Sequence, residues 1–117
     1  MFRIRKEFHF SASHRLAHLP DDHQCARLHG HNYIVVVELA AESLTRDGFV
    51  RDYHDLAPFK AYIDGTFDHR HLNDVLDVPS TAEHLARHFH DWCRARWRET
   101  AAVFVSETPK TWAEYRP

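Results

Sequence analysis

Residues 28–40, LHGHNYIVVVELA, are the stretch that decides the fold most clearly. The β-branched run at 34–37 predicts a strand, because such side chains pack well on a pleated surface. His29 and His31 lie two positions apart at the start of this strand, so both imidazoles project from the same face. Gly30 between them allows another backbone to approach closely. Two imidazoles on one face supply half of a tetrahedral metal site.

Hydrophobic periodicity outside this strand predicts three more strands. Apolar residues alternate near both ends of the chain, and Asp47-Gly48 and Pro109-Lys110 are typical turn residues that separate the expected elements. The strands are expected at residues 2–10, 28–40, 101–108 and 111–115, with a loop over 16–27.

Two helices are expected between the second and third strands, because apolar residues recur there at steps of three and four. The first is expected to begin at Asp55 as N-cap, and the second has the capping-box spacing of Ser80 and Glu83. Their apolar stripes consist of Leu56, Phe59 and Ile63 in the first helix, and of Leu85, Phe89 and Trp92 in the second. The order ββααββ predicts an α+β fold, a four-stranded antiparallel sheet with two helices on one face.

The composition is that of one small globular domain. The chain has 117 residues, which fits a single domain over 1–117. Its 15 Lys and Arg against 17 Asp and Glu give a net charge of -2, which argues against nucleic acid or an anionic membrane as a partner. Two distant cysteines, and no apolar run of signal-peptide or membrane-spanning length, predict a soluble cytoplasmic protein.

A third metal ligand is available in His14, just after the first strand. If the first two strands pair as a hairpin, His14 lies beside His29 and His31 and completes a divalent-metal site, for which zinc is the first choice. The alternative is that these histidines line a polar groove. Sites of three histidines also accept iron, nickel or cobalt.

Cys25 divides the metal hypothesis in two. If its thiolate is a fourth ligand, the site is closed and structural; if not, three histidines leave an open position for a substrate. A thiolate beside such a site is a capable base or nucleophile. The polar neighbours of Cys25 argue against its burial, whereas Cys93 lies in the second expected helix and belongs in the core.

Two further groups suit proton transfer and ligand binding. Asp68 can orient His69 and stabilise its charged form, with a solvated loop as the alternative. Strand alternation places Glu107 on the apolar face of the third strand. A carboxylate on that face is either exposed to water at the edge of the sheet or buried with a partner. A buried Glu107 suits a ligand with a guanidine-like pair of N–H groups, because two acceptor oxygens match two donors.

Five sequence elements together resemble one enzyme family. They are FSASHRL (10–16), CARLHGHNY (25–33), FDHRHLND (67–74), PSTAEHLA (79–86) and VSETPKTWAEY (105–115). The chain resembles the 6-pyruvoyl-tetrahydropterin and 6-carboxytetrahydropterin synthases over nearly its whole length. The resemblance implies that His14, His29 and His31 bind zinc and that Cys25, Asp68 and His69 are catalytic. It also implies that Glu107 anchors a pterin ring, with Thr81 as a further contact.

The three residues between Cys25 and His29 are similar to the spacing in the bacterial carboxy-forming enzymes. The resemblance therefore implies conversion of 7,8-dihydroneopterin triphosphate to 6-carboxytetrahydropterin, acetaldehyde and triphosphate, in queuosine (7-deazaguanine) biosynthesis. Pyruvoyl-forming or related side-chain-cleaving activity is the alternative, and outside the enzymes, a zinc-stabilised binding module. The resemblance also implies the tunnelling fold, in which sheets of several subunits join into a barrel. A homo-oligomer, either a trimer or a dimer of trimers, then has its active sites between subunits.

Overall fold

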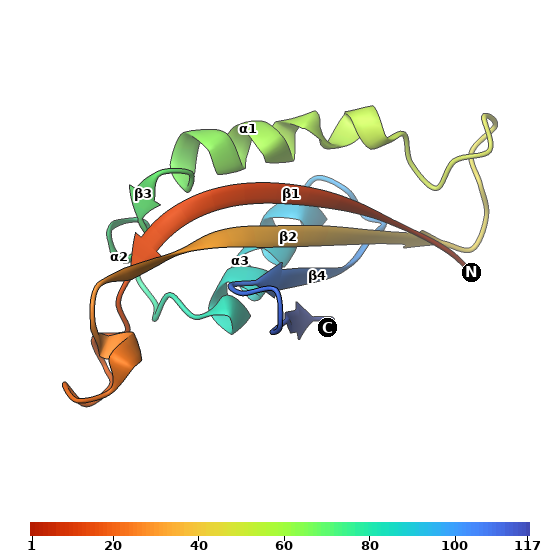
Figure 1. Ribbon diagram of the computed structural model, residues 1–117. Coiled ribbons are helices and arrows are strands. Elements are labelled where there is room, and N and C mark those ends of the chain that lie inside the picture. Colours follow the sequence, from red (N-terminus) through yellow and green to blue (C-terminus); the bar gives the residue numbers. More distant parts are fainter.

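The computed structural model describes every residue of the chain, 1–117. A five-stranded sheet in the order β3-β1-β2-β4-β5 carries helices on one face (Figure 1). The strands are β1 (Phe2–His14), β2 (His29–Ala41), β3 (Arg70–His71), β4 (Thr100–Ser106) and β5 (Ala113–Tyr115). The helices are α1 (Ala57–Thr66), α2 (Leu72–Val75) and α3 (Ala82–Arg94), with the short 3-10 turns η1 (Gln24–Ala26) and η2 (Tyr53–Leu56).

The sheet confirms the α+β class and corrects one expectation. It is mixed and five-stranded rather than four-stranded and antiparallel, because β3 pairs in parallel with β1 at Ala12 and Ser13. The other neighbouring pairs are antiparallel, as expected. β3 was not predicted because a strand of two residues is too short to show an alternating pattern in the sequence.

The β1–β2 hairpin decides where the site lies. Its register runs without a break from Phe2 opposite Ala41 to His14 opposite His29. The two strands extend along the molecule, which measures 55 × 25 × 24 Å, with the loop after β1 at one end and the N-terminus at the other (Figure 1). Pairing therefore brings together two histidines that are fifteen positions apart in the sequence.

The core lies between the sheet and the two long helices. Phe8 and Phe10 point to the same side of β1, and they pack on Phe59 of α1 and Phe89 of α3 with ring centroids 4.9 and 6.0 Å apart. Both helices therefore cover one face of the sheet, as expected. Cys93 is fully buried in this core, which confirms its predicted place.

Both helices begin away from the expected caps. Asp52, rather than Asp55, accepts a backbone N–H at the start of η2, and α1 follows this turn. Thr81, rather than Ser80, caps α3, since its hydroxyl oxygen accepts the backbone N–H of His84 at 3.2 Å. This shift of one residue leaves the Ser80 side chain free to contact His14 instead.

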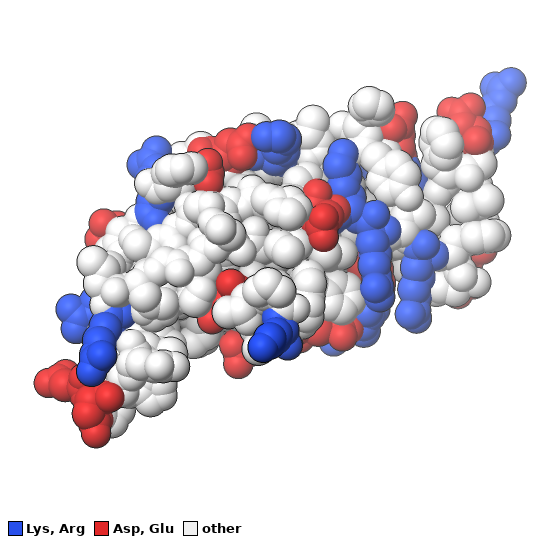
Figure 2. Space-filling view, in the orientation of Figure 1, with Lys and Arg blue, Asp and Glu red and all other residues white.

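The surface carries both signs of charge. Acidic and basic side chains both occur across the face shown in Figure 2, in agreement with the small net charge. None of the helices has the length and apolar character needed to span a bilayer.

Candidate metal centre

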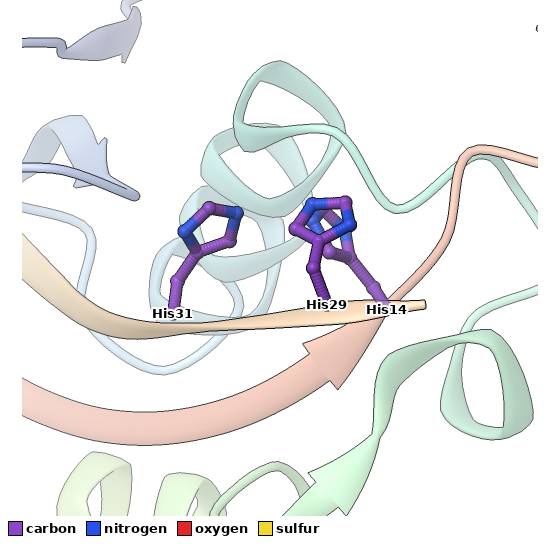
Figure 3. A group of neighbouring side chains, drawn as sticks. All are labelled: His14, His29 and His31. Carbon is purple, nitrogen blue, oxygen red and sulfur yellow. The ribbon is translucent and has the colours of Figure 1, made fainter. Parts of the chain in front are cut away.

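Three histidines converge at the closed end of the β1–β2 hairpin. His14, His29 and His31 each offer a ligand atom, and these atoms lie within 4.8 Å of one another. Their ring centroids are 4.5 to 5.2 Å apart. Figure 3 shows the His31 and His29 rings side by side in front of α3, with the His14 ring behind that of His29. The hairpin register and strand alternation produce this grouping, because His14 pairs with His29 and His31 follows on the same face.

The hydrogen bonds of two rings fix which nitrogen is free. The Nδ1 of His14 lies 2.8 Å from the carbonyl oxygen of Ser80, and the Nδ1 of His29 lies 2.7 Å from that of Arg27. Carbonyl oxygens only accept, so both Nδ1 atoms donate and each Nε2 keeps its lone pair. The Nε2 atoms of His14 and His31 are buried without any partner. Metal-binding imidazoles are commonly oriented by such carbonyl contacts.

This donor set fits a divalent metal ion. Burial lowers the pKa of both His14 and His31, so that the neutral, ligating form is favoured. Buried nitrogens with free lone pairs are costly unless something binds them. Three neutral imidazoles match zinc, and they match iron, nickel or cobalt as well.

Cys25 is not part of this cluster. It lies half-buried in η1, on the loop that joins β1 to β2, and its carbonyl oxygen accepts the backbone N–H of Leu16 at 2.8 Å. Its partial exposure agrees with the expectation drawn from its polar neighbours. The geometry therefore matches the open form of the metal hypothesis, three histidines with a free position.

Glu107 lies directly beside the histidines. It follows β4, and its Oε2 is 3.7 Å from the Nε2 of His31. Burial raises the pKa of Glu107, whereas His14 acts in the opposite direction. Thr81 and Glu107 share the wall of a pocket of about 510 Å³, which Trp112 also lines. Glu107 lies between its two predicted alternatives, because its side chain is 27% exposed and has His31 beside it.

Asp68 and His69 form a separate pair. The Oδ2 of Asp68 lies 2.9 Å from the Nδ1 of His69, and its Oδ1 accepts the backbone N–H of Ser11 at 2.9 Å. The Ser11 contact and the His69 contact both lower the pKa of Asp68. His69 has a φ of 58°, a left-handed value that is uncommon for residues other than glycine. The expected Asp68–His69 contact is therefore present.

This pair lies beside the edge of β1, where the backbone of Ser11 donates to Asp68 and accepts the backbone N–H of His69. His69 lines a pocket of about 480 Å³ together with Ser11, Ser13 and Asn32, and His31 of the metal cluster also borders it. Strand alternation points the side chains of Ser11, Ser13 and Asn32 away from the face that carries His14 and His31. Within one chain, the three histidines lie together with Glu107 beside them and Thr81 in the adjoining pocket, whereas Asp68 and His69 lie outside the cluster of ligand atoms.

Two residues at the metal centre were missed in the sequence. Ser80, interpreted as a helix cap, is buried and orients His14 through its carbonyl oxygen and, at 3.1 Å, its hydroxyl. Tyr33 is fully buried beside His14 and His31, with ring centroids 6.2 and 5.5 Å away. The signal for Tyr33 was its position two residues after His31, on the same strand face.

Comparison with known proteins gives consistent results. The family model described as 6-pyruvoyl tetrahydropterin synthase matches residues 3–117. The 6-carboxy-5,6,7,8-tetrahydropterin synthase of Bacillus subtilis is 32% identical over 99% of this chain and 86% of that protein. The protein of the same name from Synechocystis is 35% identical over 98% of this chain and 93% of that protein. The structure of Caenorhabditis elegans 6-pyruvoyl tetrahydropterin synthase superposes with a TM-score of 0.87 at 27% identity, covering 99% of this chain and 95% of that one.

Proposed function

The chain belongs to the 6-pyruvoyl tetrahydropterin synthase family, and we propose that it is a 6-carboxytetrahydropterin synthase. In this proposal it converts 7,8-dihydroneopterin triphosphate to 6-carboxy-5,6,7,8-tetrahydropterin, acetaldehyde and triphosphate, on the route to queuosine and other 7-deazaguanines. The observation that carries the proposal is an open three-histidine cluster with a half-buried carboxylate 3.7 Å from one ring. The curated relatives that cover nearly the whole chain carry the carboxy-forming name.

His14, His29 and His31 would hold the metal, which we propose to be zinc. When bound, zinc supplies Lewis-acid polarisation of substrate oxygens. The chain's own contribution is to keep three neutral imidazoles aimed at one point. The carbonyl oxygens of Ser80 and Arg27 hold two of these rings in the ligating tautomer.

Glu107 would bind the pterin ring. Its two oxygens can accept the paired N–H groups of an aminopyrimidinone edge, which is bidentate recognition. Its pocket, shared with Thr81, is next to the histidines, so a ring held there would place its side chain toward the metal position. Burial strengthens this recognition because fewer water molecules compete for the carboxylate.

Cys25 would remove a proton from the substrate side chain, and His69, oriented by Asp68, would handle protons on the other side of it. Because Asp68 and His69 lie at the edge of β1 and outside the histidine cluster, a second copy of the chain would supply them. The active site would then lie between subunits of a homo-oligomer, a trimer or a dimer of trimers.

The sheet has an edge suited to such assembly. β3 covers β1 only at Ala12 and Ser13, so the rest of this strand has no neighbour on that side. Exposed strand edges pair readily with other chains. In the proposal, sheets of neighbouring subunits join at such edges into a barrel. We also place the enzyme in the cytoplasm, where Cys25 and Cys93 would remain reduced, as they are here.

Product analysis tests the proposed reaction. The purified, zinc-loaded chain is incubated with 7,8-dihydroneopterin triphosphate, and the products are separated by mass spectrometry. We expect 6-carboxytetrahydropterin with one equivalent of acetaldehyde. A pyruvoyl pterin without acetaldehyde would overturn the carboxy assignment in favour of the second candidate, the activity named for the C. elegans protein. A zinc-stabilised binding module would yield neither product.

A further inference from the structure

Three buried side-chain atoms of this protein lack any hydrogen-bond partner, and all three are in one place. They are the Nε2 atoms of His14 and His31 and the hydroxyl oxygen of Tyr33. A metal ion accounts for the two nitrogens, but it leaves the phenol unexplained. A buried hydroxyl without a partner is costly, so its retention here calls for a partner in the working state of the site.

The surroundings of Tyr33 restrict what that partner is. One face of its ring stacks on Phe10, with centroids 4.7 Å apart and planes within 8° of parallel. Across the sheet, Ile34 of β2 pairs with Ser106 of β4, so the next positions outward, Tyr33 and Glu107, are neighbours on the helix-facing side. The negative charge of Glu107 contributes to raising the pKa of Tyr33, behind the larger effect of burial. Glu107 is thus the anionic residue next to Tyr33 across the sheet, and its carboxylate can accept a hydrogen bond from a phenol.

Glu107 has two competing uses at this point. Its Oε2 lies 3.7 Å from the Nε2 of His31, close enough for the carboxylate to turn and occupy the free metal position. A carboxylate there would close the site, because four ligands complete a tetrahedral sphere. Something must hold Glu107 toward its own pocket if the metal position is to stay open.

We infer that Tyr33 is a positioning residue, whose hydroxyl donates a hydrogen bond to the Glu107 carboxylate in the loaded site. This bond keeps the carboxylate away from the metal position and orients it toward the ring. A carboxylate has about four lone-pair directions, so it can accept from Tyr33 and from two ligand N–H groups together. The inference rests on the proposed function in assigning the ring to Glu107.

If the Tyr33 hydroxyl bonds to Glu107 only when metal and ligand are bound, its removal should affect ligand binding but not the stability of the metal-free protein. Tyr33→Phe removes an unpartnered hydroxyl, so the melting temperature of the metal-free protein stays within about 1 °C of wild type or rises. Tyr62→Phe is the matched control, because the Tyr62 hydroxyl lies 2.7 Å from the Nε2 of His88, away from the site. Losing that satisfied hydrogen bond lowers the melting temperature by about 4 °C.

The binding arm uses neopterin as the probe, with zinc-loaded protein and neopterin fluorescence as the signal. Tyr33→Phe is expected to bind neopterin about tenfold more weakly, while zinc affinity is unchanged or tighter. Tyr62→Phe binds both as wild type does. Glu107→Gln, measured in parallel, is expected to lose neopterin binding at least as severely.

The outcomes separate the two ideas. If Glu107→Gln binds neopterin as tightly as wild type, the ring site proposed on Glu107 is wrong and the inference fails with it. If Glu107→Gln is weakened while Tyr33→Phe is not, the inference alone is overturned. A metal-free Tyr33→Phe protein that melts as early as Tyr62→Phe would also overturn it, since the hydroxyl would then have a structural partner.

Discussion

Replacing His29 with alanine removes one of three metal ligands while disturbing the rest of the fold little. His29 is half-buried at the start of β2, whereas His14 is 1% exposed and its removal would open a hole in the core. The only hydrogen bond of the His29 ring goes to the carbonyl oxygen of Arg27 at an exposed position. We therefore expect the metal-free His29→Ala protein to lose about 0.5 to 1 kcal/mol of unfolding free energy.

The metal-dependent part of the stability should change far more. A ligand present at a thousand times its dissociation constant adds about 4.1 kcal/mol to the unfolding free energy. A domain of 117 residues has an unfolding entropy of about 0.25 kcal/mol/K, so this corresponds to a rise of about 16 °C in melting temperature. Losing one of three nitrogen ligands and about a hundredfold in affinity leaves about 1.4 kcal/mol, or about 6 °C.

Differential scanning fluorimetry at a buffered free-zinc concentration measures both quantities. Wild type, His29→Ala and the control His9→Ala are each melted with and without zinc. His9 is exposed and pairs with Glu7, away from the cluster, so its variant should keep the full zinc-dependent rise. A His29→Ala protein with the wild-type rise would refute the three-histidine site.

Three other predictions concern the surroundings of the site. Ser80→Ala removes the hydroxyl 3.1 Å from the Nδ1 of His14 but keeps the carbonyl contact, so zinc affinity measured by competition with a chelator should fall about tenfold. The metal-free protein should lose stability in urea as pH falls below 6.5. Burial lowers the pKa of His14 and His31 in the folded state, so the unfolded chain binds more protons there, with a slope of up to about 1.4 kcal/mol per pH unit for each ring. Phe89→Ala should lower the unfolding free energy by about 3 to 5 kcal/mol in urea, because that ring is fully buried between Phe10 and Phe59; a cost below 1 kcal/mol would contradict this view of the core.

Much of the fold follows from local pattern. The β-branched run at 34–37 marks β2, and the two-residue spacing of His29 and His31 is enough to place both rings on one face of that strand. The stripe of the second helix also places Cys93 in the core. Such features depend on period and parity, which a single sequence displays directly.

What the sequence did not reveal depends on contacts between distant segments. β3 exists only because the chain returns beside Ala12 and Ser13, and two residues carry no period. The adjacency of Asp68 and His69 left both their contact and a solvated loop open, and it did not show that they lie against the backbone of Ser11. Ser80 and Thr81 are both good caps, and the choice between them follows from the contact of Ser80 with His14.

The metal content of two purified proteins tests the central claim, an open site of three histidines with Cys25 outside it. Wild type and Cys25→Ala are loaded with zinc, desalted and analysed for metal per chain, and their turnover of 7,8-dihydroneopterin triphosphate is measured on the same samples. We expect one zinc per chain in both proteins, with turnover lost only in Cys25→Ala. Loss of zinc from Cys25→Ala would contradict it, because the cysteine would then be a fourth ligand of a closed structural site.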